Sequence, residues 1–84
     1  MIHRVFSVFD VKAGAHLQPF FSPTKATAIR SITELVRDDK HQFGKYPSDY
    51  TLFFLGEFDD EKGMFTLMPA PASLGVLVEF KQEV

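Results

Sequence analysis

The chain has 84 residues, of which 45% are hydrophobic and 24% charged, and it contains ten phenylalanines and no cysteine. This length predicts one domain with a single core, and the composition is that of a folded chain rather than a disordered one. The lack of cysteine excludes disulfide bonds and zinc sites built on thiolates.

The net charge of −2 is unevenly distributed along the chain. Residues 1–45 carry seven basic and four acidic side chains, a balance of +3, whereas residues 46–84 carry two basic and seven acidic ones, a balance of −5. A chain with this separation can present a basic face although its total charge is negative. The charge therefore argues against a uniformly basic nucleic-acid-binding protein but leaves room for a local basic surface.

The first predicted element is a strand over residues 2–10, which are rich in β-branched and aromatic side chains. Its apolar residues fall on both faces, with Phe6 and Val8 on one and Val5 and Phe9 on the other. This two-sided pattern indicates a central strand or one covered by a second chain. A turn is predicted at residues 10–15, where Gly14 is best able to take a positive φ.

An extended arm is predicted between Pro19 and Pro23, because each proline disfavours the helical conformation in the residue before it. The arm carries Phe20 and Phe21, and adjacent side chains of an extended segment point in opposite directions. One ring must therefore face the core, while the other covers a sheet edge or is available for stacking.

One amphipathic helix follows the arm. Ser22 before Pro23 offers an N-cap with proline at the first helical position, and Thr24 is an alternative cap. Apolar residues then recur at three- and four-residue steps up to Val36, which predicts a helix ending near residue 38 or 39.

The second half of the chain reads as a hairpin with an apolar extension. Residues 39–49 are predicted to form a loop, residues 50–58 a strand, residues 59–63 a charged turn and residues 64–68 the returning strand. Pro69 and Pro71 should take the chain out of the sheet, so that residues 68–84 form an extended C-terminal segment. Its apolar part, residues 74–80, is expected to add a strand to its own sheet or to that of a neighbouring subunit.

These elements predict an α+β fold in a single domain spanning residues 1–84. One amphipathic helix packs on a small, mostly antiparallel sheet in the order strand, arm, helix, strand, strand, and an extra C-terminal strand is left open.

Catalytic and metal sites find no support in the sequence. The histidines at positions 3, 16 and 41 lack the spacing of paired metal ligands and accompany no nucleophile motif, and no glycine-rich phosphate loop is present. The acidic turn at residues 59–63 is too short for a calcium loop. We therefore expect no enzymatic activity, no metal and no cofactor.

The longest apolar run, residues 52–55, falls far short of the roughly 20 residues that span a bilayer. Residues 1–4 are followed by a strand pattern rather than by the apolar core of a signal peptide. We therefore expect no membrane partner and a location in a cytoplasm.

A nucleic-acid-binding surface has two candidate components. Phe20 and Phe21 could stack on exposed bases, or could serve only the core and a sheet edge. The basic residues of the helix and the loop after it could contact phosphates, or could form a solvated face balanced by Glu34, Asp38 and Asp39. The residues alone do not decide between these readings.

The order of several short motifs adds a resemblance. A strand ending in Asp10-Val11-Lys12-Ala13-Gly14 is followed by Pro19-Phe20-Phe21, by Arg30 in the helix, by Pro47-Ser48-Asp49-Tyr50 and by Gly56-Glu57-Phe58-Asp59. Over residues 4–63 the chain resembles the small non-structural protein of microviruses, chiefly the gokushovirus branch that includes the chlamydia phages. The resemblance implies a protein made in the cytoplasm of the infected bacterium, absent from the virion and usually described as DNA-binding. It offers no catalytic residues to carry over.

Two functional hypotheses follow. The first is a non-enzymatic accessory protein of a small single-stranded DNA phage that binds single-stranded DNA during genome replication or the switch to packaging. Its predicted DNA-binding residues are Arg4, Lys12, Lys25, Arg30, Arg37, Lys40, Phe20 and Phe21.

The second hypothesis is a homo-oligomeric adaptor, with a dimer favoured, that contacts host or viral proteins such as a replication protein and does not touch DNA. Its predicted oligomer interface consists of apolar residues of the C-terminal segment, namely Leu74, Val76, Leu77, Val78 and Phe80.

Overall fold

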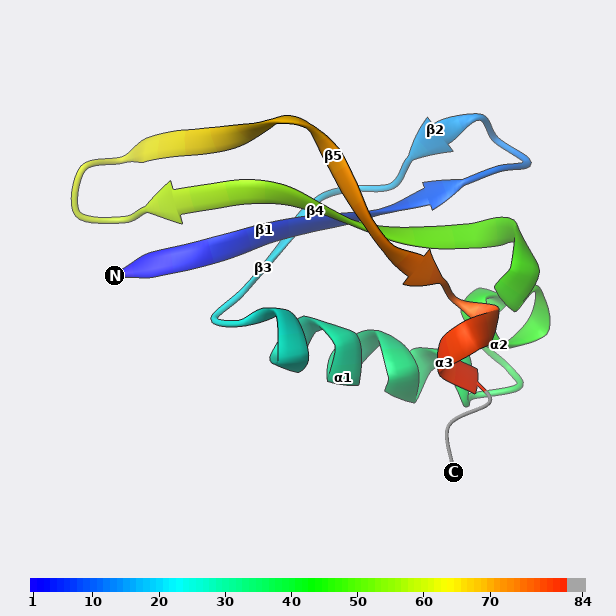
Figure 1. Cartoon of the computed structure of the whole chain (residues 1–84). Coiled ribbons are helices and arrows are strands. Elements are labelled where there is room, and N and C mark those ends of the chain that lie inside the picture. Colours follow the sequence, from blue (N-terminus) through cyan, green and yellow to red (C-terminus); the bar gives the residue numbers. More distant parts are fainter. Residues whose placement is uncertain (82–84) are drawn as a thin grey trace.

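The computed structural model describes residues 1–81, which form one antiparallel sheet of five strands with helices on one of its faces (Figure 1). The strands are β1 (Ile2–Asp10), β2 (Ala15–His16), β3 (Phe20–Ser22), β4 (Tyr50–Asp59) and β5 (Met64–Val76). β1 and β4 are central, β5 forms one edge, and β2 and β3 both pair with the other side of β1.

The helices are α1 (Lys25–Val36), α2 (Gln42–Lys45), the 3-10 helix η1 (Pro47–Asp49) and α3 (Val78–Lys81). α1 begins after Thr24, whose Oγ1 accepts a hydrogen bond from the Thr27 N–H at 3.1 Å, so the alternative cap is the one used. No helix within residues 1–81 is long and apolar enough to cross a membrane.

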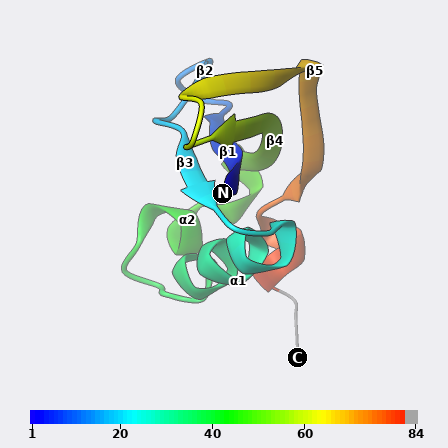
Figure 2. The same cartoon turned by 90° about the vertical axis from the view of Figure 1, so that its left-hand side faces the viewer.

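The main core lies between α1 and the face of the sheet that we call the outer face (Figure 2). Phe6 is fully buried there, with ring centroids 5.6 Å from Phe20 and 5.5 Å from Phe54. The buried members of this core are Phe6, Val8, Ala28, Ile32, Val36, Phe43, Tyr50, Leu52, Phe54 and Leu77. The two-sided apolar pattern of the first strand is explained, since Val5 is also buried, on the opposite, inner face.

The prediction of one helix on a small sheet is wrong, because the structure is mostly strand and its sheet curls into a half-barrel. The pairing of β1 with β4 shifts between Val5 and Phe6, and the pairing of β4 with β5 shifts at two further places. Such bulges increase local twist and bend the sheet. The curl brings Phe21 of β3 and Phe65 of β5, from opposite edges, to a ring-centroid separation of 6.4 Å.

Two segments, predicted as an extended arm and as a loop, form regular elements. The extended arm is β3, in which Phe21 pairs with Val5 and Phe20 with Phe6. The loop predicted over residues 39–49 contains α2 and η1, where the His41 side chain caps α2 through the Phe43 N–H. Short helices of this length carry no periodic pattern, which is why the sequence did not indicate them.

The expectation that the chain leaves the sheet at Pro69 is also wrong. β5 continues through both prolines to Val76, because residues 68–71 form a bulge between the pairs Phe54–Ala72 and Gly56–Leu67, where no pairing with β4 needs the missing N–H of proline. Residues 74–76 therefore complete β5 and residues 78–81 form α3, instead of a separate extra strand. The last three residues of the predicted C-terminal segment, 82–84, lie outside the described residues.

Candidate nucleic-acid interface

Four rings form a cluster on the inner face of the curled sheet, which we call the aromatic cluster: His3, Phe21, Phe58 and Phe65. The Phe58 ring centroid lies 5.8 Å from that of Phe21 and 4.7 Å from that of Phe65, and His3 meets the edge of Phe21 at 6.3 Å. Phe21 and Phe65 are each 53% exposed. Large rings that remain half exposed offer flat apolar surface to a ligand.

Strand register places these rings on one face. His3 pairs with Phe58, Phe58 pairs with Phe65, and Val5 pairs with Phe21. Cross-strand partners of an antiparallel sheet point to the same side, and alternate residues along β1 share that side. The cluster is therefore fixed by the backbone pairing of four strands.

A second group of rings lies at the other end of the inner face. The His16 ring meets Phe9 at 5.0 Å and Phe53 at 5.3 Å, both edge to face, and its Nδ1 is hydrogen-bonded to the Ser7 Oγ at 2.7 Å. The paired positions on this face, from His3 to Phe9 in β1 and their partners in the other described strands, include no carboxylate. An anion approaching the inner face meets rings and imidazoles.

Acidic groups gather instead at the β4–β5 turn beside the aromatic cluster. The terminal ammonium of Met1 donates to Asp60 Oδ1 at 2.8 Å and to Glu61 Oε2 at 3.4 Å, and His3 Nε2 lies 2.8 Å from Asp60 Oδ2. The hydrogen bond to Asp60 is the main reason why the pKa of the Met1 amino group lies above its usual 8.0. The same bond, followed by that with His3, lowers the pKa of Asp60 below 3.8. The turn is therefore tied to the start of β1 by charge.

The directions of the two pKa shifts give the pH range over which the contact between the Met1 amino group and Asp60 stabilises the fold. The contribution of the amino group to stability is complete below pH 8.0 and is lost as the pH rises through its raised pKa. The contribution of Asp60 is present above pH 3.8 and is lost as the pH falls through its lowered pKa. All these groups are solvent-exposed, so the contribution is small.

Replacing Asp60 with Asn should return the pKa of the Met1 amino group towards 8.0, because the largest cause of its shift is removed. An NMR titration of protein with a free amino terminus measures this value. Glu34→Gln, an exposed change on α1, is the control and should leave it unaltered. An unchanged pKa in D60N would show that the Met1–Asp60 bond does not form in solution.

The structure divides the predicted DNA-binding residues into separate places. Phe20 packs in the core and Phe21 belongs to the aromatic cluster, so the two rings take the opposite directions that an extended segment requires. Arg4 donates from Nη1 to the Pro23 carbonyl at 2.9 Å, and Lys25 Nζ lies 4.8 Å from the Phe54 ring centroid. Arg4 and Lys25 thus lie beside the start of α1.

The remaining predicted cations lie elsewhere. Arg30 and Arg37 are exposed on the side of α1 turned away from the sheet, whereas Phe21 is on the opposite face of that sheet. The β1–β2 turn, which carries Lys12, and the segment between α1 and α2, which carries Lys40, lie at the end of the molecule opposite the β4–β5 turn (Figure 1). Arg30, Arg37, Lys12 and Lys40 therefore do not form one continuous surface with Phe21.

Sequence reasoning missed Phe58 and Phe65 as partners of Phe21. A signal was present, because the predicted turn at residues 59–63 joins two strands, and Phe58 and Phe65 form the second pair of residues counted from that turn. Pairing the strands outward from that turn places the two rings opposite each other.

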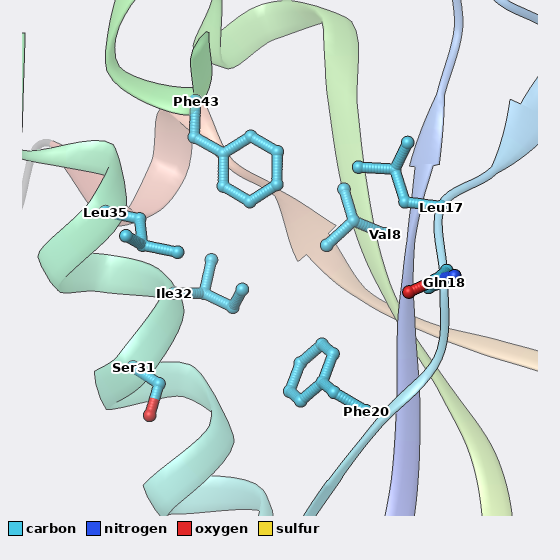
Figure 3. Close-up of a pocket in the computed structure, with 8 residues that line it drawn as sticks. All are labelled: Val8, Leu17, Gln18, Phe20, Ser31, Ile32, Leu35 and Phe43. Carbon is cyan, nitrogen blue, oxygen red and sulfur yellow. The ribbon is translucent and has the colours of Figure 1, made fainter. Parts of the chain in front are cut away.

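An apolar cavity of about 210 Å³ lies between α1, β1 and the segment that leads into β3 (Figure 3). Its lining residues are Val8, Leu17, Gln18, Phe20, Ser31, Ile32, Leu35 and Phe43. Gln18 and Ser31 are its polar members, and neither titrates. Within residues 1–81 no group of three or more potential ligands is placed to hold a metal ion.

The predicted oligomer interface is largely used inside the chain's own fold. Leu77 is fully buried, Leu74 and Phe80 pack against the core, and Val76 and Val78 are partly buried. An intermolecular role for these residues stays a prediction.

Comparison with known proteins places the chain among proteins of small bacteriophages. The family model described as Phage ORF5 protein matches residues 3–80. Protein ORF5 of Chlamydia phage 1 is 36% identical over 64 residues, which cover 71% of this chain and 67% of that protein. The chain belongs to the phage ORF5 protein family, and its resemblance to the chlamydia-phage type of microvirus protein is confirmed. No solved structure matches it.

Proposed function

We propose that this phage protein is a non-enzymatic accessory protein that binds single-stranded DNA without sequence preference. It would act in the cytoplasm of the infected bacterium, outside the virion, during genome replication or the switch to packaging. The observation that carries the proposal is the aromatic cluster, in which Phe21 and Phe65 are each 53% exposed on a curled sheet.

Single strands suit this surface better than duplexes. Proteins that hold single strands stack unpaired bases on aromatic side chains, at about 1–3 kcal/mol per base, and every base has a flat face. In a duplex those faces are already stacked on one another. The inner face carries rings at both of its ends, and a flexible single strand of DNA could follow them with successive bases.

Phosphate contacts would come from the edge of the sheet next to β3. Lys25 follows Phe21 by four residues at the start of α1, and Arg4 reaches the intervening Pro23 carbonyl. The acidic turn on the other side is partly neutralised, because Asp60 and Glu61 are bonded to the Met1 ammonium. Arg4 and Lys25 lie on the outer face, so a DNA strand stacked on Phe21 would bring its phosphates to them by passing over the β3 edge.

Fluorescence anisotropy of a labelled single strand of roughly 30 bases tests the proposal, since this exceeds the roughly 4–16 nucleotides that one OB fold, a domain of similar size, covers. Replacing Phe21 and Phe65 with Ala should weaken binding about 5- to 150-fold for each base whose stacking is lost. Tyr46→Ala, which removes an equally exposed ring from α2's C-terminal end, is the control and should bind normally.

Binding should also weaken with salt, with a slope of log affinity against log salt near −0.7 for each phosphate contacted. No binding at low salt would refute the DNA-binding proposal and favour a protein adaptor. Binding that survives the loss of both rings but falls in Arg30→Glu would move the site from the inner face to α1.

A further inference from the structure

One edge of the sheet is open and apolar. β5 pairs with β4 on one side, and none of the other strands within residues 1–81 pairs with its second side. Every residue from 64 to 71 is exposed, including Met64 at 62%, Phe65 at 53% and Leu67 at 64%. Unpaired N–H and C=O groups on such a strand are a template for another strand.

This edge lacks the features that normally protect one. No residue from 63 to 78 is ionisable, whereas exposed edge strands usually carry lysine or other charges. Pro69 and Pro71 lack a backbone N–H donor, but both follow Met68 in the sequence. A continuous segment of five residues, Met64–Met68, is therefore left able to pair along its whole length.

We propose that a second copy of this chain occupies the edge, with the two β5 strands antiparallel about a two-fold axis through Thr66. In this register Phe65 lies opposite Leu67 of the second copy, Met64 lies opposite Met68 of the second copy, and the two Thr66 residues face each other. Each pair joins two apolar side chains or two hydroxyl groups, and such cross-strand pairs stabilise a sheet. The segment is thus complementary to itself.

The ends of the segment fix this register. The turn that ends at Gly63 precedes the segment, and Pro69 removes a donor after it. A shift in either direction therefore loses hydrogen bonds or brings the acidic turn onto the strand. The two-fold axis is perpendicular to the joined sheet, so the inner faces of the two chains lie on the same side of that sheet.

This association of two chains does not depend on DNA binding.

The mass of the full chain in solution, measured by light scattering over a series of concentrations, tests the proposal. We expect twice the 9.5 kDa of one chain. Thr66→Lys should give a monomer, because two ammonium groups would face each other across the axis. Within one chain the new lysine would face Glu57, the partner of residue 66 on β4, so the fold should tolerate it. The matched control is Ser48→Lys, an equal charge change at an exposed residue of η1, and it should remain a dimer.

A monomeric wild-type chain, or a T66K chain that is folded by circular dichroism and still dimeric, would overturn the proposal. If T66K fails to fold, Thr66→Cys decides the question, because the natural chain has no cysteine. Mild oxidation should join T66C chains into disulfide-linked dimers much faster than it joins Ser48→Cys chains. Equal rates for the two variants would also overturn the proposal.

Discussion

Replacing Phe6 with Ala is expected to lower the free energy of unfolding by about 3–5 kcal/mol. Phe6 is fully buried and its ring packs between Phe20 and Phe54. Its truncation therefore leaves a cavity bordered by β1, β3 and β4. Small domains have about 5–15 kcal/mol of stability in total, so this single change removes a large share of it. Urea unfolding at one fixed protein concentration measures the loss.

Phe21→Ala is the matched control, because it deletes the same side chain from the inner face, where the ring is already 53% exposed. Its effect should be about 1 kcal/mol, the worth of its aromatic contacts. A loss for F21A equal to that for F6A would contradict the placement of the main core between β1 and α1.

Replacing Gly56 with Ala is expected to cost roughly 2–5 kcal/mol. Gly56 has a φ of +150° and lies directly against β5, where a Cβ would overlap the Thr66 carbonyl oxygen and come within 2.8 Å of the Leu67 Cα. Both are backbone atoms, which cannot move aside without separating the two strands. Thermal or urea unfolding measures the cost.

Gly63→Ala separates crowding from backbone strain. Gly63 also has a positive φ, +66°, but no atom lies within 4 Å of the position of its Cβ. Only the strain remains, at about 1–2 kcal/mol. If G56A costs no more than G63A, β4 and β5 are not in close contact at Gly56.

Elements with a strong periodic pattern were predictable from the sequence. The first strand has the predicted bounds. α1 begins after Thr24, the alternative cap, and ends at Val36 instead of near residue 38 or 39. The hairpin around residues 59–63 was also predicted, because acidic residues ending in Gly63 separate two runs of strand-forming side chains.

The curl of the sheet was not predicted, because it depends on bulges whose positions follow from tertiary packing. A local signal did exist at Gly56, since an isolated glycine in a strand often marks a bulge or a close approach of backbones. The path of β5 through Pro69 was missed for a related reason. Proline excludes a central strand, and only the final strand order shows that β5 is at an edge.

The candidate site was predictable only in part. The opposite directions of Phe20 and Phe21 follow from extended geometry, and the structure agrees. The grouping of Phe21 with Phe58 and Phe65 required the pairing of distant strands. The cations were grouped by their closeness in sequence, whereas the sheet lies between Phe21 and the outward side of α1.

The aromatic cluster lies on a part of the sheet that the buried α1 residues do not support. Residues 1–4 and 59–67 are held by ladder hydrogen bonds, exposed rings and the Met1–Asp60 contact, whereas Phe6, Leu52 and Ile32 share a buried core. Segments with few buried contacts open locally at lower free energy than the whole molecule unfolds. The protein thus has two zones of unequal stability, and the cluster belongs to the looser one. A ligand that orders this zone would slow its amide hydrogen exchange while leaving exchange in the helix-backed zone nearly unchanged.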